Sequence, residues 1–318
     1  MHSRLATSGA RGSWPKLHRV KPRNVMQSCS MRFARNSTRH SPLSSLNNLE
    51  GTLLVPLAAR ALGARLHPSL DPHDRIAAQL LRQCAVSVKE LEDDPYTILN
   101  ILWRTQVIKT AGVEFFQQHP SATGVNLGCG LSRHFQWFDN GLNRWIDADT
   151  AHVIQLRHSL MQTRQANQTK DRSYDRVVDL RHAGWWKAVF QNAPAKEPIF
   201  FLLEGVLMYF DPPVVAMIVK TIAEKAPNGS HLLCDFISPI GVGHARDNAT
   251  MESTGAEFRW GAKGACDFLE MHPSLQLVCQ HSVSQVYGPL GPWIEWSLTP
   301  WSSGPLYAMA QFEIEARH

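Results

Sequence analysis

Short apolar segments alternate along residues 121–318 with segments whose apolar residues recur at helical spacing. The most hydrophobic run covers residues 198–203 (PIFFLL), and further runs cover residues 123–127, 144–147, 174–179, 230–237, 275–282 and 306–314. Nearly continuous apolar runs are typical of strands that helices cover on both faces. The alternation therefore predicts an α/β fold with a mostly parallel sheet.

The residues that precede this alternation are predicted to be helical, and helical spacing also fills the gaps between the predicted strands. The predicted helices cover residues 52–63, 74–84, 96–118, 151–162, 184–190, 212–226 and 262–271. Two segments, about 238–261 and 284–305, follow no clear period, and we expect them to form lids or binding loops. We therefore predict one domain over residues 50–318, with N-terminal helices in 50–120 and an α/β core in 121–318.

The first 49 residues differ in composition from the rest of the chain. They contain nine basic side chains and no acidic one, whereas the remaining residues carry 23 basic and 27 acidic side chains. The formal charge of +5 therefore comes from this extension, and the rest of the chain lacks the basic footprint of a nucleic-acid-binding protein. A disordered leader, a mitochondrial transit peptide, or a start site placed upstream of a true initiator at Met26 or Met31 would each fit.

Composition also bears on location and redox state. The longest apolar stretch has 12 residues and includes Glu204, whereas a bilayer span needs about 20 apolar residues. The six cysteines show neither a C-x-x-C pair nor metal-ligand spacing, which favours free thiols and no metal centre. We expect a cytoplasmic protein that binds neither membrane nor nucleic acid, or a mitochondrial one if the extension is a transit peptide. The oligomeric state stays open.

The sharpest local motif is VNLGCG, an apolar strand that enters a glycine turn. Gly128 and Gly130 would let the backbone come close to a ligand beyond the carboxyl end of that strand. Asp147 and Asp149 follow about 20 residues later, at the distance where an acid accepts hydrogen bonds from a ribose diol. Arg133 stands where a dinucleotide fingerprint has its third glycine. An adenosyl ligand without phosphates therefore fits this motif better than a dinucleotide.

Two further acidic residues follow predicted strands. Glu204 comes directly after the most hydrophobic run, in the segment LEGVLMYF, and a buried glutamate needs a partner. Asp179 ends another predicted strand and is followed by Leu180. Both acids would lie at the carboxyl edge of the sheet, where parallel sheets bind ligands. Asp179 could accept a hydrogen bond from an adenine amino group while Leu180 packs on the ring.

Taken in this order, the three motifs resemble the leucine carboxyl methyltransferase family of S-adenosylmethionine-dependent O-methyltransferases, most clearly over residues 50–236. The resemblance rests on the segments LGCGL, WIDAD, Asp179-Leu180 and EGVLMY. It implies a Rossmann-like class I methyltransferase fold, with a seven-stranded sheet whose last strand is antiparallel, N-terminal helices and a lid. It also implies S-adenosylmethionine as the cofactor.

The resemblance further implies roles for the matching residues of this chain. The implied cofactor contacts are Arg104 for the methionine carboxylate, Gly128 and Gly130 at the methionyl turn, Asp147 and Asp149 for the ribose, Asp179 and Leu180 for the adenine, and Glu204 for the amino group. Tyr209 and His134 are the candidate catalytic side chains, and Tyr209 would lie near the substrate.

One segment departs from the family pattern. Most members continue the glycine turn with Leu-Asp-Thr-Arg, whereas this chain has Leu131, Ser132, Arg133 and His134. The acid is lost, and the cation is either displaced to Arg133 or replaced by His134. A methyltransferase-like domain that binds without turnover is therefore one alternative function.

Methyl transfer from a sulfonium depends chiefly on holding the nucleophile and the methyl group in line. We expect a small acceptor of polyketide type that offers a carboxylate, which needs no base, or a phenol, which a base would help. His134, His244 and Arg246 are the polar groups considered for that role. The alternatives are methylation of a protein C-terminal carboxylate and a nicotinamide-dependent oxidoreductase, which the missing third glycine argues against.

The late part of the chain is rich in tryptophan. Trp293, Trp296 and Trp301 lie within ten residues of one another. Large aromatic side chains either pack in a core or line a site for a large aromatic ligand. We expect core packing for these three, with a role in lining the acceptor site as the alternative.

Overall fold

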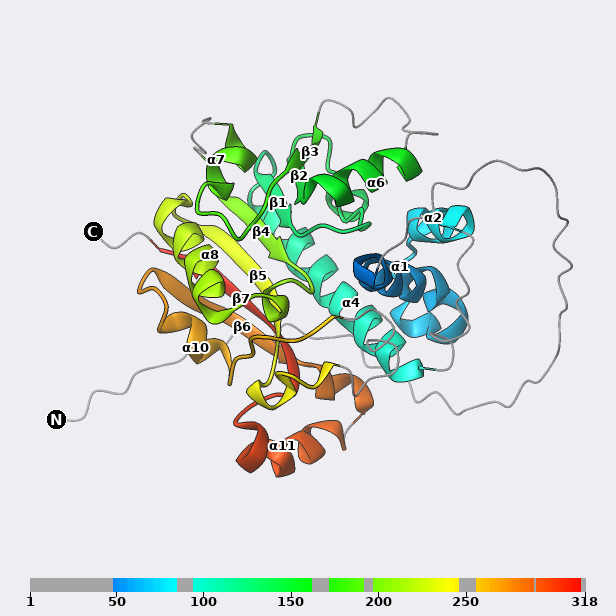
Figure 1. Cartoon of the computed structure of the whole chain (residues 1–318), viewed down its shortest axis with the longest axis vertical. Helices are drawn as coiled ribbons and strands as arrows, with labels where there is room; N and C mark the ends of the chain where they lie inside the picture. The colour runs from blue at the N-terminus through cyan, green and yellow to red at the C-terminus, as the bar shows by residue number, and fades with distance from the viewer. Residues whose placement is uncertain are drawn as a thin grey trace, which may run out of the picture. The chain divides into compact units, whose positions relative to one another are not determined.

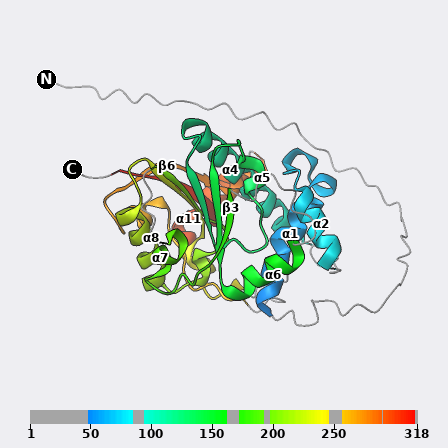
Figure 2. The same ribbon diagram turned by 90° about the horizontal axis from the view of Figure 1, so that it is seen from above.

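A seven-stranded sheet with helices on both faces forms the centre of the unit that spans residues 41–318 (Figures 1 and 2). The computed structural model describes residues 48–84, 94–161, 172–191, 197–245, 256–288 and 290–315, all within the unit that spans residues 41–318. The strands are β1 (Thr123–Leu127), β2 (Arg144–Asp149), β3 (Ser173–Val177), β4 (Ile199–Leu203), β5 (Ser230–Ile237), β6 (Leu275–Ser282) and β7 (Tyr307–Ile314). The α-helices are α1 (Asn48–Leu66), α2 (Arg75–Cys84), α4 (Pro95–Gln118), α5 (Phe135–Phe138), α6 (Ala151–Met161), α7 (Trp185–Phe190), α8 (Pro212–Lys225), α10 (Ala265–Leu269) and α11 (Gly291–Ser302).

The strand order is β3-β2-β1-β4-β5-β7-β6. The pairs among β1 to β5 are parallel, and β7 lies antiparallel between β5 and β6. This arrangement confirms the predicted α/β sheet and the class I methyltransferase fold. From β1 the order runs outward to β2 and β3 on one side and to β4 and β5 on the other. Ligands of such sheets bind where the order reverses, at the carboxyl ends of β1 and β4.

Strand β4 shows why helices cover both faces of the sheet. All five of its residues are buried, and neighbouring side chains point to opposite faces. Phe201 packs against Trp186 of α7, with 5.7 Å between the ring centroids. Phe200 packs on the other side against Phe115 of α4, at 5.4 Å. The apolar run that predicted this strand therefore belongs to two hydrophobic cores, one on each face.

The N-terminal helices pack beside the glycine turn. Leu57 of α1 and Leu80 of α2 form a small cluster with Leu131, which follows the turn after β1. The buried guanidinium of Arg60 strengthens this contact, because Nη2 donates to Oγ of Ser132 at 3.0 Å. Helix α1 thereby becomes part of the wall beside the ligand end of the sheet, and α2 packs against α1.

The expectation that residues 284–305 lack regular structure is wrong. The 3₁₀ helix η5 (Val283–Tyr287) and α11 occupy much of this segment. The sequence did not predict α11 because the helix contains Pro300 and begins at Gly291, and both residues are typical of loops. A second helix, α5, is only four residues long and was not predicted.

The tryptophans of α11 point to solvent. Trp293, Trp296 and Trp301 are 69%, 71% and 72% exposed, so the expected core packing is wrong. They are also absent from the residues that line the cavity described below, which removes the alternative role at the acceptor site.

Other expectations fall partly outside the described residues. Of the predicted lid at 238–261, the structure shows the 3₁₀ helix η3 (Pro239–Gly241), whereas residues 246–255, including Arg246, lie outside the description, as do residues 1–47.

The cysteines that are described carry free thiols, and the described residues hold no metal-binding cluster of His, Cys, Asp and Glu. None of the described helices is long and apolar enough to cross a bilayer.

Strand β6 forms one edge of the sheet. Its register with β7 shifts between Leu277 and Cys279, which marks a β-bulge. Leu277 and Val278 beside the shift are 44% and 49% exposed. The strand bends at this point while the residues on either side stay paired with β7.

Candidate functional site

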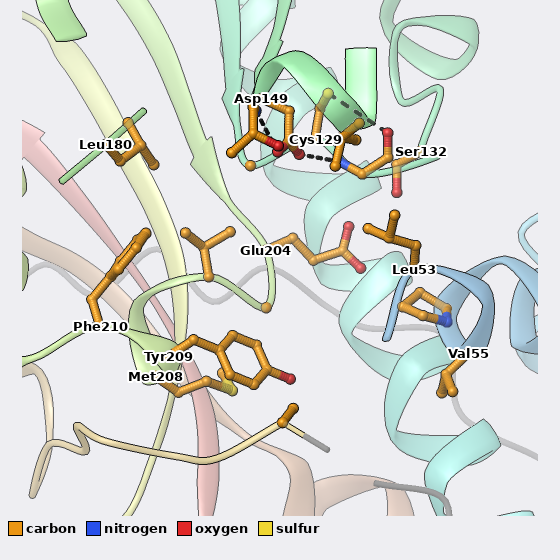
Figure 3. Close-up of a pocket in the computed structure, with 18 of the residues that line it drawn as sticks. Leu53, Val55, Cys129, Ser132, Asp149, Leu180, Glu204, Met208, Tyr209 and Phe210 are labelled. Atoms are coloured by element: carbon orange, nitrogen blue, oxygen red, sulfur yellow. Dashed lines mark hydrogen bonds between the residues drawn. The ribbon is translucent and has the colours of Figure 1, made fainter. Parts of the chain in front are cut away.

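A cavity of about 1060 Å³ opens at the carboxyl ends of β1, β2 and β4 (Figure 3). Helices α1 and α4 form one wall, and the segments that follow β1 to β4 form the others. Sites for one drug-sized ligand have about 300–1,000 Å³. The cavity therefore lies at the upper end of this range.

The glycine turn after β1 forms one rim of the cavity. The backbone of Gly128 and Gly130 has positive φ, at 71° and 51°, which favours glycine. A Cβ atom on Gly128 would lie 2.5 Å from Cγ2 of Val206, so the turn packs directly on the segment after β4. Both glycines line the cavity at the expected place.

Gly128→Ala should lower the free energy of unfolding by about 1–3 kcal/mol, because it adds both backbone strain and a close contact. Gly141→Ala is the matched control, since Gly141 also has positive φ, at 86°, but a Cβ atom there would meet nothing within 4 Å. Urea denaturation measures both variants. Equal losses would show that the contact with Val206 costs nothing.

Asp149, at the end of β2, lines the cavity. Its Oδ2 accepts a hydrogen bond from the backbone N–H of Gly130 at 2.8 Å, and Oδ1 accepts one from that of Thr150 at 2.7 Å. Burial raises the pKa of this carboxyl group. The strand end and the glycine turn thus hold one carboxylate at the cavity wall.

Asp147, the other candidate for the ribose, lies behind the wall. It is fully buried and is not among the residues that line the cavity. Its Oδ1 accepts hydrogen bonds from Trp145 and Asn126, and its Oδ2 pairs with Nη2 of Arg157 at 2.5 Å. The expected ribose contact does not agree with this placement, because protein groups already bind both oxygens.

Arg157 of α6 was not singled out in the sequence, yet it supports the whole turn. Its Nη1 donates to the carbonyl oxygens of Gly130 at 2.7 Å and Ser132 at 2.8 Å, while Nη2 contacts Asp147 and, at 3.4 Å, Asp175. An arginine in a helix is ordinarily a surface residue, so nothing in its spacing reveals this role.

Asp179 and Leu180 follow β3, which ends at Val177, and both line the cavity. The Asp179 carboxylate accepts hydrogen bonds from Nε and Nη2 of Arg181, and these bonds lower the pKa of Asp179 to about 2. Leu180 is nearly buried and lies on the wall of the cavity (Figure 3). The adenine contact stays a prediction for this pair.

Glu204 lies at the centre of a buried polar cluster. Its Oε1 accepts from Nε of Arg104 at 2.8 Å and lies 3.8 Å from Nη1 of Arg60, while Oε2 is 2.6 Å from Nε2 of His134. Burial alone would raise the pKa of Glu204, but Arg104 and the hydrogen bond with His134 outweigh it and hold the pKa well below its usual range. The glutamate is therefore a carboxylate.

His134 does not reach the cavity. It is fully buried, and it is absent from the lining residues, whereas Glu204 in front of it is among them. A side chain in this position cannot touch a substrate, so a direct catalytic role for His134 is excluded in this conformation. His244 is likewise not among the lining residues.

Arg104 of α4 lines the cavity as expected, and it has partners that the sequence did not reveal. Its Nη1 donates to Oδ2 of Asp235 at 3.3 Å and to the hydroxyl of Tyr307 at 3.0 Å. The Tyr307 hydroxyl itself donates to Asp235 at 2.6 Å. Asp235 lies near the carboxyl end of β5, a position comparable to that of Glu204, and this could have singled it out.

Tyr209, in the 3₁₀ helix η2 (Leu207–Tyr209), lines the other half of the cavity. Its ring packs on Phe258 at 5.6 Å between centroids, and burial raises the pKa of its hydroxyl to about 12. Figure 3 shows the hydroxyl pointing toward α4 below Glu204. The hydroxyl therefore stays protonated at neutral pH and can donate a hydrogen bond. The surroundings are mostly apolar and include Val55, Met208 and Phe210.

The donor set fits an adenosyl ligand that carries a methionyl group. Asp149 offers acceptors for a diol, Glu204 offers a negative charge for an ammonium group, and Arg104 offers a positive charge for a carboxylate. Leu180 and its neighbour Val178 offer an apolar wall for a flat ring. The apolar half around Tyr209 stays available for a second ligand.

Comparison with known proteins agrees with this chemistry. Residues 54–223 match the model of the family described as Leucine carboxyl methyltransferase. The chain is 27% identical over 217 residues to the tetracenomycin polyketide synthesis O-methyltransferase TcmP of Streptomyces glaucescens, a match covering 68% of this chain and 76% of that protein. It is 25% identical over 232 residues to the S-adenosyl-L-methionine-dependent methyltransferase dpfgK of Gibberella zeae, with the same coverage. In fold it is similar to a DUF574 family protein from Streptomyces avermitilis, with a TM-score of 0.50, 11% identity and coverage of 81% of this chain and 97% of the other.

Proposed function

Because this chain belongs to the leucine carboxyl methyltransferase family and is an S-adenosylmethionine-dependent methyltransferase, we propose that it methylates an oxygen atom of a small molecule. The acceptor we propose is a polyketide-type aromatic compound that carries a carboxylate or a phenol. The observation that carries this proposal is the apolar half of the cavity around Tyr209, next to the polar half that suits the cofactor.

The cofactor supplies a methyl group on a positively charged sulfur, and the protein has to hold the acceptor oxygen in line with it. In the cavity, Glu204 and Arg104 would fix the methionyl end, and Asp149 the ribose. Aromatic side chains beside them, Tyr209 and Phe258, would hold a flat acceptor by stacking and burial.

A carboxylate is the acceptor that needs least from the protein. Among the described residues that line the cavity, the histidine is His152, which follows Asp149 on the ribose side. The acceptor half offers the Tyr209 hydroxyl and the cation Arg259, neither of which is a base at neutral pH, and beside them the carboxylates of Asp211 and Glu257, which are only weak bases. An acceptor that is already ionised would react without one, whereas a phenol would benefit from a base.

Tyr209→Phe should reduce kcat/KM for the acceptor about 3- to 10-fold, the effect of one neutral hydrogen bond. The affinity for S-adenosylhomocysteine should stay within about 2-fold, because Tyr209 lies in the acceptor half. Tyr174→Phe is the control, since Tyr174 lies in β3 and does not line the cavity. A selective loss of cofactor affinity in Tyr209→Phe would contradict this placement.

The function itself is tested with the full-length protein, S-adenosylmethionine and three matched acceptors: anthraquinone-2-carboxylate, 2-hydroxyanthraquinone and 2-aminoanthraquinone. We expect a methyl ester or methyl ether by mass spectrometry and no N-methylated product. Transfer to the amine alone would contradict an O-methyltransferase. Binding of S-adenosylhomocysteine without transfer to any acceptor in a wider screen of aromatic acids and phenols would favour a non-catalytic binding domain.

A further inference from the structure

We propose that His134, which stands where the family's Leu-Asp-Thr-Arg segment has its arginine, is a positioning residue that holds the Glu204 carboxylate toward the amino group of the cofactor. This role depends on the proposed placement of the methionyl end at Glu204.

The geometry at Glu204 leaves its carboxylate little freedom. The two oxygens are held from different sides, Oε1 by Arg104 at 2.8 Å and Oε2 by His134 at 2.6 Å. His134 is fully buried and Glu204 is 9% exposed, so water hardly competes for these bonds. Figure 3 shows the side chain extending from the end of β4 toward α4, with its carboxylate beside the cavity. The remaining lone pairs are thereby kept in one orientation.

The hydrogen-bonding pattern of His134 assigns its proton. Nδ1 is buried and has no hydrogen-bond partner among the described residues, while Nε2 faces Glu204. Because the Glu204 carboxylate can only accept, Nε2 is the donor of this hydrogen bond. The ring packs 5.2 Å from that of Trp137, which holds the donor in place.

The other side chains of the altered segment do not take this role. The Arg133 guanidinium lies near Met161, with Nη1 3.5 Å from its Sδ atom, so the displaced-cation alternative is wrong. Ser132 stands where the family has aspartate, and its Oγ accepts from Arg60. Arg60 in turn is paired with Asp74 at 3.0 Å. Within the altered segment, His134 is therefore the side chain that contacts Glu204. The charged neighbours of Glu204 are Arg60 and Arg104.

The test compares two ligands on the full-length protein by calorimetry. S-adenosylhomocysteine carries the amino and carboxylate groups, whereas 5′-methylthioadenosine has the same adenosine and sulfur without them. His134→Leu should weaken the first about 10- to 100-fold, as expected for a hydrogen bond to a charged group, and the second by less than about 2-fold. His134→Gln, whose amide can still donate to Glu204, should recover most of the loss. Arg133→Leu is the neighbouring control and should change neither affinity.

Two results would overturn the proposal. Unchanged affinity for S-adenosylhomocysteine in His134→Leu would show that Glu204 needs no such partner. Equal losses for both ligands, with no recovery in His134→Gln, would mark His134 as a general structural residue. If the leucine variant does not fold, His134→Asn, whose amide is too short to reach Glu204, takes its place with the same expectations. Failure of the unchanged protein to bind S-adenosylhomocysteine would instead overturn the cofactor site itself.

Discussion

Arg157→Met should lower the free energy of unfolding by about 3–5 kcal/mol, because it removes one partner of a buried ion pair and leaves the other uncompensated. Asp147 is fully buried and would keep its charge without a cation, and the carbonyl oxygens of Gly130 and Ser132 would lose their donor. Methionine is close to arginine in length, so packing changes little. Urea denaturation followed by tryptophan fluorescence measures the loss.

The matched control is Arg181→Met. The Arg181 side chain also pairs with an aspartate, Asp179, but it is 65% exposed, and exposed pairs contribute at most about 1 kcal/mol. A loss in Arg157→Met no larger than in Arg181→Met would contradict a supporting role for the buried guanidinium. A large loss would show that a side chain outside the cavity holds the turn that borders it.

Asp149→Asn should weaken the binding of S-adenosylhomocysteine about 10- to 100-fold, because a carboxylate accepts hydrogen bonds from a ribose diol more strongly than an amide does. Both ligands of the His134 experiment contain the diol, so both should lose affinity to the same extent. This pattern separates the ribose end from the methionyl end. A loss confined to S-adenosylhomocysteine would contradict the assignment of Asp149 to the ribose.

The proposed contact between Asp149 and the ribose diol also predicts how cofactor affinity depends on pH. The charged form of Asp149 binds the diol, so affinity is present above the pKa of this group and is lost as the pH falls through it. Burial raises the pKa of Asp149, so the loss should begin at a higher pH than for an ordinary aspartate. Calorimetric titrations over the acid range measure it. In Asp149→Asn this part of the dependence should be absent, and its persistence there would point to another group.

The fold was predictable from the sequence because its strands are buried on both faces. Such strands appear as uninterrupted apolar runs, and the bounds of β1 and β5 agree with the predicted ones. Helix α11 was missed for the opposite reason. This helix lies on the surface, contains Pro300 within its sequence and exposes its tryptophans to solvent. Neither its composition nor its hydrophobic period is therefore typical of a helix.

The residues of the site were predictable only where they stand at the end of a parallel strand, because that position places them at the ligand edge of the sheet. Asp149 and Glu204 stand at the ends of parallel strands, and the structure brings both to one cavity. The partners of these acids come from distant parts of the chain. His134 is 70 residues from Glu204, and Arg157 lies on a helix whose pattern gives no sign of an inward arginine. Such pairings depend on tertiary packing, which no local pattern encodes.

The bulge in β6 has a consequence for how the protein behaves at high concentration. An edge strand presents unpaired backbone groups that can serve as a template for a strand of another molecule, and apolar residues such as Leu277 and Val278 would favour such stacking. The register shift bends the edge there, so a straight strand cannot align along its whole length. The irregularity thus acts as protection against edge-to-edge aggregation on the side of the sheet farthest from β3.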